Sequence, residues 1–139
     1  MQTILAKTAG FCFGVDRAVS LVEQAVADGK SVVTLGPIIH NRHVIDRFAD
    51  EGVREIETPE QAKPGDCVII RSHGVTKAVY DALERLGVEI IDATCPFVKK
   101  IHQIISAAEE NGQKPVIIGT RSHPEVQAIA GWCREPLIF

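Results

Sequence analysis

Residues 12–40 read CFGVDRAVSLVEQAVADGKSVVTLGPIIH, and this stretch decides the fold because its plan occurs twice. Cys95 follows Cys12 by 83 residues (95 − 12). His123 follows His40 by the same interval (123 − 40), so each cysteine precedes its histidine by 28 residues. Two pairs of glycines keep this spacing, Gly29 with Gly112 and Gly36 with Gly119. Such internal repetition predicts one structural unit used twice.

Each copy begins with a helical pattern. Apolar residues recur at helical spacing over 15–26 and again over 98–108, and a glycine follows each run as a helix C′ residue would. A shorter stripe over 75–86 stops at Gly87. The sequence therefore predicts three amphipathic helices with glycine at their C-terminal ends.

Short apolar runs at 32–35, 67–70 and 116–118 lie between these helices. Continuous apolar sequence of this length is typical of strands buried on both faces of a parallel sheet. Residues 136–139, PLIF, also resemble a strand. Strands that alternate with helices predict an α/β fold with right-handed crossovers.

The composition is that of an ordinary soluble globular protein of about one domain, with 139 residues, 45% hydrophobic and 24% charged. A net charge of −3 and dispersed Lys and Arg argue against a nucleic-acid surface. The first ten residues hold one Lys and an apolar stretch that is too short for a signal peptide. No apolar segment reaches the length of a membrane span. A cytoplasmic, reducing setting follows, in which four cysteines suggest metal or redox chemistry more than disulfides.

A histidine follows each of the three predicted strands: His40, His73 and His123. Ligands of open α/β sheets bind outside the carboxyl ends of the strands. A single loop histidine is usually without function, but three at equivalent positions favour convergence on one ligand.

Cys12 and Cys95 each stand just ahead of a predicted helix. A thiol there faces unpaired backbone N–H groups and the positive end of the helix dipole, which favour the thiolate that ligates iron or zinc. A small apolar residue packed at a strand–helix junction is the plainer alternative, and the repetition argues against it. Cys67 and Cys133 are expected to be structural, and C-x-x-C zinc spacing is absent.

Other polar residues have weaker claims. Asn41 either touches a ligand or caps a helix that starts at Arg42, and Glu125 either acts chemically or complements a helix dipole. His43 and His102 are expected to be solvated on helices. Arg71 and Arg121 either assist an anion or, as we expect, are simply exposed.

Five motifs, GFCFGVDRAV, HN at 40–41, SHGV at 72–75, DATCP at 92–96 and SHPEV at 122–126, together resemble the LytB family of 4-hydroxy-3-methylbut-2-enyl diphosphate reductases. Their order and spacing match over all 139 residues. The resemblance implies a trefoil of three α/β units with short, largely parallel sheets around a central cavity. Residues 1–95 match the first unit and residues 96–139 an incomplete second unit, and the third unit is absent.

The resemblance also implies the site. A 4Fe–4S cluster lies on three cysteines in this family, one per unit, and Cys12 and Cys95 match the first two. The histidines His40, His73 and His123 match the diphosphate contacts, and Glu125 matches the proton donor. The third ligand lies beyond position 139, so we expect a fragment that is inactive, holds the cluster poorly and has low stability and an exposed sheet edge.

The family reaction removes a hydroxyl from an allylic diphosphate and gives isopentenyl and dimethylallyl diphosphate, the last step of the non-mevalonate isoprenoid pathway, with ferredoxin or flavodoxin as electron donor. Two alternatives stay open. One is a phosphate-ester or nucleotide-binding module without a cluster. The other is a thiol redox protein that joins Cys12 to Cys95.

Overall fold

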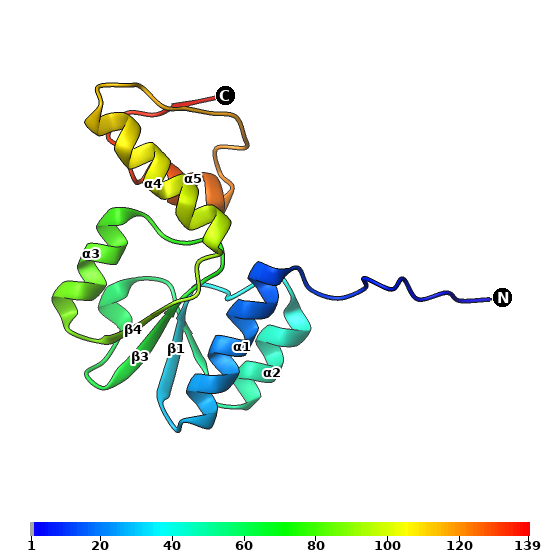
Figure 1. Ribbon diagram of the computed structural model, residues 1–139. Helices are drawn as coiled ribbons and strands as arrows, with labels where there is room; N and C mark the ends of the chain where they lie inside the picture. Colours follow the sequence, from blue (N-terminus) through cyan, green and yellow to red (C-terminus); the bar gives the residue numbers. More distant parts are fainter. Residues whose placement is uncertain (1) are drawn as a thin grey trace.

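The computed structural model describes residues 2–139, which form two α/β units (Figure 1). The helices are α1 (Phe13–Ala27), α2 (Arg42–Asp50), α3 (Lys77–Leu86), α4 (Pro96–Glu110), α5 (Pro124–Ala130) and the short 3-10 helix η1 (Pro59–Gln61). The strands are β1 (Ser31–Leu35), β2 (Arg54–Ile56), β3 (Asp66–Ile70), β4 (Glu89–Asp92), β5 (Val116–Ile117) and β6 (Leu137–Ile138).

The first unit is built on a four-stranded sheet in the order β2-β1-β3-β4. All of its neighbouring strands are parallel, and Val33 of β1 pairs with Val68 of β3. The α/β architecture is therefore confirmed. The sequence patterns missed the edge strands β2 and β4. β2 is short and mostly exposed, β4 is mostly half-buried, and neither is continuously apolar.

Helices cover both faces of this sheet (Figure 1). Val32 and Ile69 pack with α1 and α2 on one face, whereas Val33 and Val68 pack with α3 on the other. A strand covered on both sides buries every side chain, which is why β1 and β3 are apolar without alternation. Cys67 lies inside β3 and is buried, as expected of a structural cysteine.

The repeat seen in the sequence is reproduced in the helices. Both α1 and α4 have 15 residues, and both ends of α4 follow those of α1 by 83 positions (96 − 13 and 110 − 27). Gly29 and Gly112 follow the two helices with φ angles of 72° and 69°. Because this left-handed conformation is strained for residues with a Cβ, glycine follows the helix in both copies for the same reason.

The second unit has a smaller, parallel two-stranded sheet of β5 and β6. The strand expected within residues 136–139 is confirmed. The prediction that 116–118 is a buried strand is wrong in part, because only Ile117 is covered whereas Val116 is 58% and Ile118 87% exposed. Among the described residues β5 pairs with β6 alone. The side chains on either side of Ile117 lack the helix cover that β1 receives.

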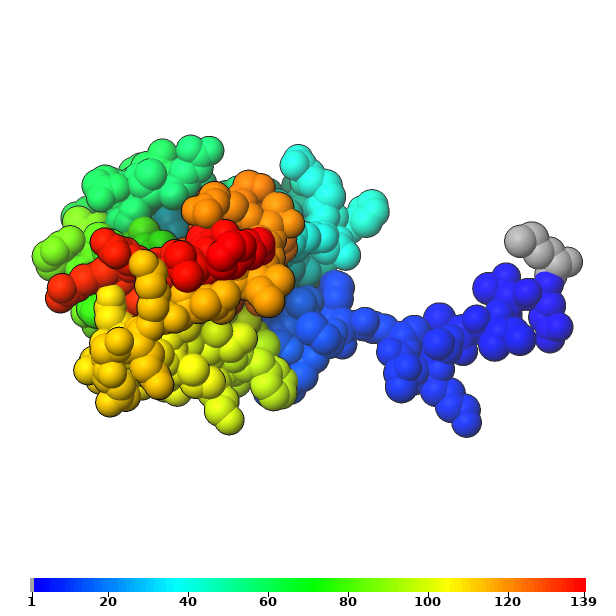
Figure 2. All heavy atoms as spheres, turned by 90° about the horizontal axis from the view of Figure 1, so that it is seen from above, coloured from blue at the N-terminus to red at the C-terminus, as the bar shows by residue number. Residues whose placement is uncertain are grey.

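Residues 2–12, which the sequence analysis placed in the first unit, contain no helix or strand and extend away from the folded body (Figures 1 and 2). All of these side chains are exposed. Figure 2 also shows the second unit lying over the top of the first. No helix within the described residues is long and apolar enough to span a membrane.

Candidate functional site

Three imidazole rings from three separate loops meet beyond the carboxyl ends of the strands. The ring centroids of His40 and His73 are 4.6 Å apart, and that of His123 lies 6.5 Å and 6.1 Å from them. His40 follows β1 and His73 follows β3, and these strands are parallel neighbours. His123 arrives from the second unit, so the cluster of rings joins the two units. The convergence expected from the sequence is what the structure has.

Local capping interactions hold two of these loops. His123 is the N-cap of α5, and its Nδ1 accepts a hydrogen bond from the Glu125 backbone N–H at 3.2 Å. That bond leaves Nε2 as the ring nitrogen able to donate to a ligand. Asn41, next to His40, caps α2 by accepting from the Val44 N–H at 3.3 Å. Its capping role is therefore confirmed.

His73 is the most perturbed of the three histidines. Burial, and then the neighbouring His40, Arg71 and His123, lower the pKa of His73 from 6.5 to about 4. Its Nδ1 is buried and has no hydrogen-bond partner among the described residues. The ring is therefore neutral near pH 7, and a bound anion beside it would favour its protonated form.

Cys12 and Cys95 are the N-cap residues of α1 and α4, and neither side chain makes a capping hydrogen bond. A Cβ added to Gly14 would lie 2.6 Å from Cys95 Sγ. The Cys95 sulfur therefore rests against the first turn of the helix that Cys12 caps. Both thiols lie at helix N-termini, and the missing side chain of Gly14 makes room for the Cys95 sulfur two residues after Cys12.

A hollow connects the start of α1 with the histidines. It has a volume of about 220 Å³ and is lined by Phe11, Val15, Ile39, His40, Asn41, Ser72 and His73. Phe11 adjoins Cys12 in the chain, and Ser72 O accepts a hydrogen bond from the Cys95 N–H at 2.9 Å. Residues next to or bonded to the two cysteines thus line the same hollow as His40 and His73.

Glu125 lies in the first turn of α5, two residues after His123, and is half-buried. Its backbone is fixed by the hydrogen bond to His123 described above. The structure therefore brings this carboxyl group to the same loop as a clustered imidazole. No contact of the carboxylate itself defines a role for it.

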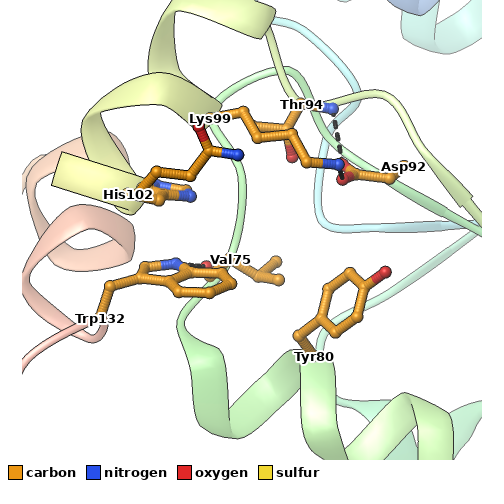
Figure 3. Close-up of a pocket in the computed structure, with 8 residues that line it drawn as sticks. Val75, Tyr80, Asp92, Thr94, Lys99, His102 and Trp132 are labelled. Atoms are coloured by element: carbon orange, nitrogen blue, oxygen red, sulfur yellow. Dashed lines mark hydrogen bonds and ion pairs between the residues drawn. The ribbon is translucent and has the colours of Figure 1, made fainter. Parts of the chain in front are cut away.

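The expectation that His102 is solvated is wrong, whereas His43 is exposed as expected. His102 is 3% exposed and stacks on Trp132 with ring centroids 4.9 Å apart (Figure 3). Burial lowers the pKa of His102. The repeat offset contained the missing signal, because position 102 corresponds to Val19 (102 − 83), a core residue of α1.

This stacked pair joins the two units beside His73. The Trp132 Nε1–H donates to Val75 O at 2.9 Å, and Val75 is two residues beyond His73. A cavity of about 260 Å³ opens beside the pair, with Tyr80 and Lys99 on its other sides (Figure 3). Cys133, the next residue, is half-buried among apolar neighbours, in agreement with a structural role.

The two candidate arginines differ from each other. Arg71, expected to be exposed, is half-buried, and its Nε donates to Gly74 O at 3.4 Å. Its Nη1 fills the space where Gly36 would carry a Cβ, so it packs between two of the histidine loops. Arg121 is exposed as expected and donates to Ile138 O at 3.2 Å.

Residues 3–139 match the family model described as LytB protein. The 4-hydroxy-3-methylbut-2-enyl diphosphate reductase of Thermoanaerobacter sp. (strain X514) is 49% identical over 137 residues, which cover 96% of this chain and 48% of that protein. The enzyme of the same name from Aquifex aeolicus is 44% identical over 135 residues, covering 96% and 46%.

Two solved structures resemble the chain closely. One is (E)-4-hydroxy-3-methyl-but-2-enyl diphosphate reductase, the terminal enzyme of the non-mevalonate pathway, with a TM-score of 0.82 and 42% identity over 97% of this chain and 49% of that one. The other is the E-1-hydroxy-2-methyl-but-2-enyl-4-diphosphate reductase from Plasmodium falciparum, with a TM-score of 0.86 and 28% identity over 91% and 40%.

The chain spans about half the length of the curated relatives it matches. The family model covers nearly every residue of this chain, including the helix-capping Cys12 and Cys95 and all three clustered histidines. By its sequence and by its fold, the chain belongs to the LytB family.

Proposed function

We propose that this chain supplies two α/β units of a reductase that acts on (E)-4-hydroxy-3-methylbut-2-enyl diphosphate. The reaction removes the C4 hydroxyl group with two electrons and two protons, and yields isopentenyl or dimethylallyl diphosphate and water. The observation that carries the proposal is the meeting of His40, His73 and His123 beside two helix-capping thiols. The two units would form part of a three-unit trefoil, with the first unit ending at Cys95.

The three imidazoles would bind the diphosphate. Each charge-assisted hydrogen bond to an anion contributes about 1.5–3 kcal/mol. His123 offers Nε2, because its Nδ1 is engaged by the Glu125 N–H. His73 is neutral in the free protein, so a dianionic group would raise its pKa and draw a proton onto it. Binding of the substrate would thus be coupled to proton uptake.

Cys12 and Cys95 would hold a 4Fe–4S cluster, and the missing side chain of Gly14 lets the Cys95 sulfur approach the helix that Cys12 caps. Within residues 2–139, no group of three or more Cys, His, Asp or Glu side chains is arranged to bind a metal ion. We propose that a third cysteine from outside these residues completes the site. When bound, the cluster supplies the electrons and a Lewis-acidic iron.

Glu125 would donate a proton to the departing hydroxyl group. Its place is suited to this role, because the carboxyl is half-buried and its backbone is tied to a diphosphate-binding histidine. A general acid contributes typically about 10²–10⁴-fold to a rate. We place the protein in the cytoplasm with ferredoxin or flavodoxin as its electron donor.

Anaerobic reconstitution of the complete protein with iron and sulfide tests this function. We expect a brown protein that forms both isoprenoid diphosphates when a strong reductant and the substrate are supplied. A colourless protein that still binds inorganic pyrophosphate would support a phosphate-binding module instead. A reversible Cys12–Cys95 disulfide, with no dependence on iron, would support the thiol redox alternative.

A further inference from the structure

Arg17, in the second turn of α1, reaches across to the loop that carries Cys95. Its Nη1 donates to Thr94 O at 3.4 Å and its Nη2 to Asp92 O at 3.2 Å. These carbonyls lie one and three residues before Cys95. The planar guanidinium presents donors in a fixed fork, so one side chain holds two carbonyls of the same loop at once.

Gly14 lies one helical turn before Arg17, on the same face of α1. A Cβ at this position would come within 2.6 Å of Cys95 Sγ and 3.0 Å of Cys95 Cβ. The face of α1 that starts beside Cys12 therefore has two features directed at Cys95. One is an open space for its sulfur, and the other is a cation that holds its loop.

The other supports of this loop come from elsewhere. Ala93 N–H donates to Ile70 O and Cys95 N–H to Ser72 O, which attach the loop to β3 and its following turn. The Asp92 carboxylate accepts from the Thr94 N–H and from Lys99, within the loop and α4 (Figure 3). Among the described residues, the hydrogen bonds from α1 to the loop are those of Arg17.

The second copy of the repeat has neither feature. The counterparts of Gly14 and Arg17 are Phe97 and Lys100 (14 + 83 and 17 + 83), and both are exposed. Helix α4 has the same length as α1 without them, so forming the helix does not require this pair. The pair is specific to the helix that faces the second cysteine.

We propose that Arg17 is a positioning residue that sets the Cys95 thiolate relative to the Cys12 thiolate, with Gly14 providing the space. This inference rests on the proposed function, in which both thiolates bind one cluster. Without the Arg17 bonds, the 92–95 loop stays attached to β3 but loses its hydrogen-bonded tie to the helix that Cys12 caps. The spacing of the two thiolates then varies, and the cluster is held less tightly.

The test compares Arg17→Met and Arg17→Lys in the complete protein, with Arg42→Met as the matched control on an exposed helical site. Iron and sulfide content, the EPR spectrum of the reduced protein and the rate of cluster loss in air are measured after anaerobic reconstitution. We expect Arg17→Met to lose its cluster several-fold faster with a changed EPR spectrum, Arg17→Lys to recover part of the loss, and the control to match wild type.

An Arg17→Met protein with wild-type iron content, spectrum and cluster lifetime would overturn the inference. A wild-type protein that takes up no cluster would instead refute the proposed function.

In that case a second experiment tests the positioning role of Arg17. It measures the rate at which dibromobimane cross-links Cys12 to Cys95 in metal-free protein that carries Cys67→Ala and Cys133→Ser. We expect a several-fold slower cross-link in Arg17→Met, and an unchanged rate would overturn its positioning role. Should Arg17→Met fail to fold, the Arg17→Lys comparison serves in both measurements, with a smaller expected change.

Discussion

The two copies of the repeat, residues 12–40 and 95–123, have matching helices and very different strands. α1 and α4 start and end at equivalent positions. Leu35 of β1 is 4% exposed, whereas its counterpart Ile118 (35 + 83) is 87% exposed. Helix bounds depend on local capping and on glycine, and so both copies share them. Burial of a strand depends on its neighbours, which only β1 has on both sides.

The copies also differ in chemistry, and this difference carries the largest expected effect. The counterpart of Glu125 in the first copy is Arg42 (125 − 83), which is exposed and paired with Asp46. In the complete protein, Glu125→Gln should lower kcat by about 10²–10⁴-fold, because the proposed proton donor is lost. Binding of pyrophosphate, measured by calorimetry, should stay near wild type. Retained turnover would show that the acid lies elsewhere.

Stability mutants test the contrast between the strands directly. Leu35→Ala should cost about 2–5 kcal/mol, because it leaves a cavity in a covered core. Ile118→Ala, its matched partner, should stay within about 0.5 kcal/mol. Urea midpoints of the 139-residue chain measure both. Equal losses would mean that β5 is covered in solution. Separately, a sharp cooperative melt of the isolated, unmutated monomer would contradict the low stability that we expect of the chain.

The histidines allow a pH-dependent comparison between a half-buried and an exposed residue of the first unit, His73 and His43. Because the pKa of His73 is about 4 in the folded protein and 6.5 for an ordinary histidine, the unfolded chain binds more protons between these values. The contribution of His73 to stability should therefore be present above pH 6.5 and decline as the pH falls toward 4. His73→Gln should flatten this dependence in urea titrations, and the exposed His43→Gln should leave it unchanged. A flat wild-type profile would contradict the lowered pKa.

The two copies should differ least at the helix ends that they share. Gly29→Ala and Gly112→Ala each place a Cβ at a positive φ, of 72° and 69°, and should cost about 1–2 kcal/mol. Thermal or urea unfolding should give similar losses for the two variants. Clearly unequal losses would indicate that the copies differ in their helix ends as well as in their strands.

The sequence predicted the features that depend on contacts between near neighbours in the chain, and it missed those that depend on contacts between distant residues. The three helices with apolar stripes (α1, α3 and α4) and the apolar strands β1 and β3 depend on near neighbours, and they were predicted. Capping of α2 by Asn41 was one of the two roles that the sequence left open. His102 and Arg71 were misjudged as solvated or exposed, because their burial comes from Trp132 and Gly36, far away in the chain. Short edge strands such as β2 carry too few apolar residues to be recognised.

The sequence by itself determined the repeat, the two helix-capping cysteines and the three histidines that follow strands, since these depend on spacing along the chain. Only the tertiary structure decided that the three rings stand 4.6–6.5 Å apart, that the Cys95 sulfur rests against Gly14, and that Arg17 joins the two cysteine-bearing segments. Each of these contacts joins residues that lie 33 or more positions apart, so tertiary packing and not local sequence sets their distances.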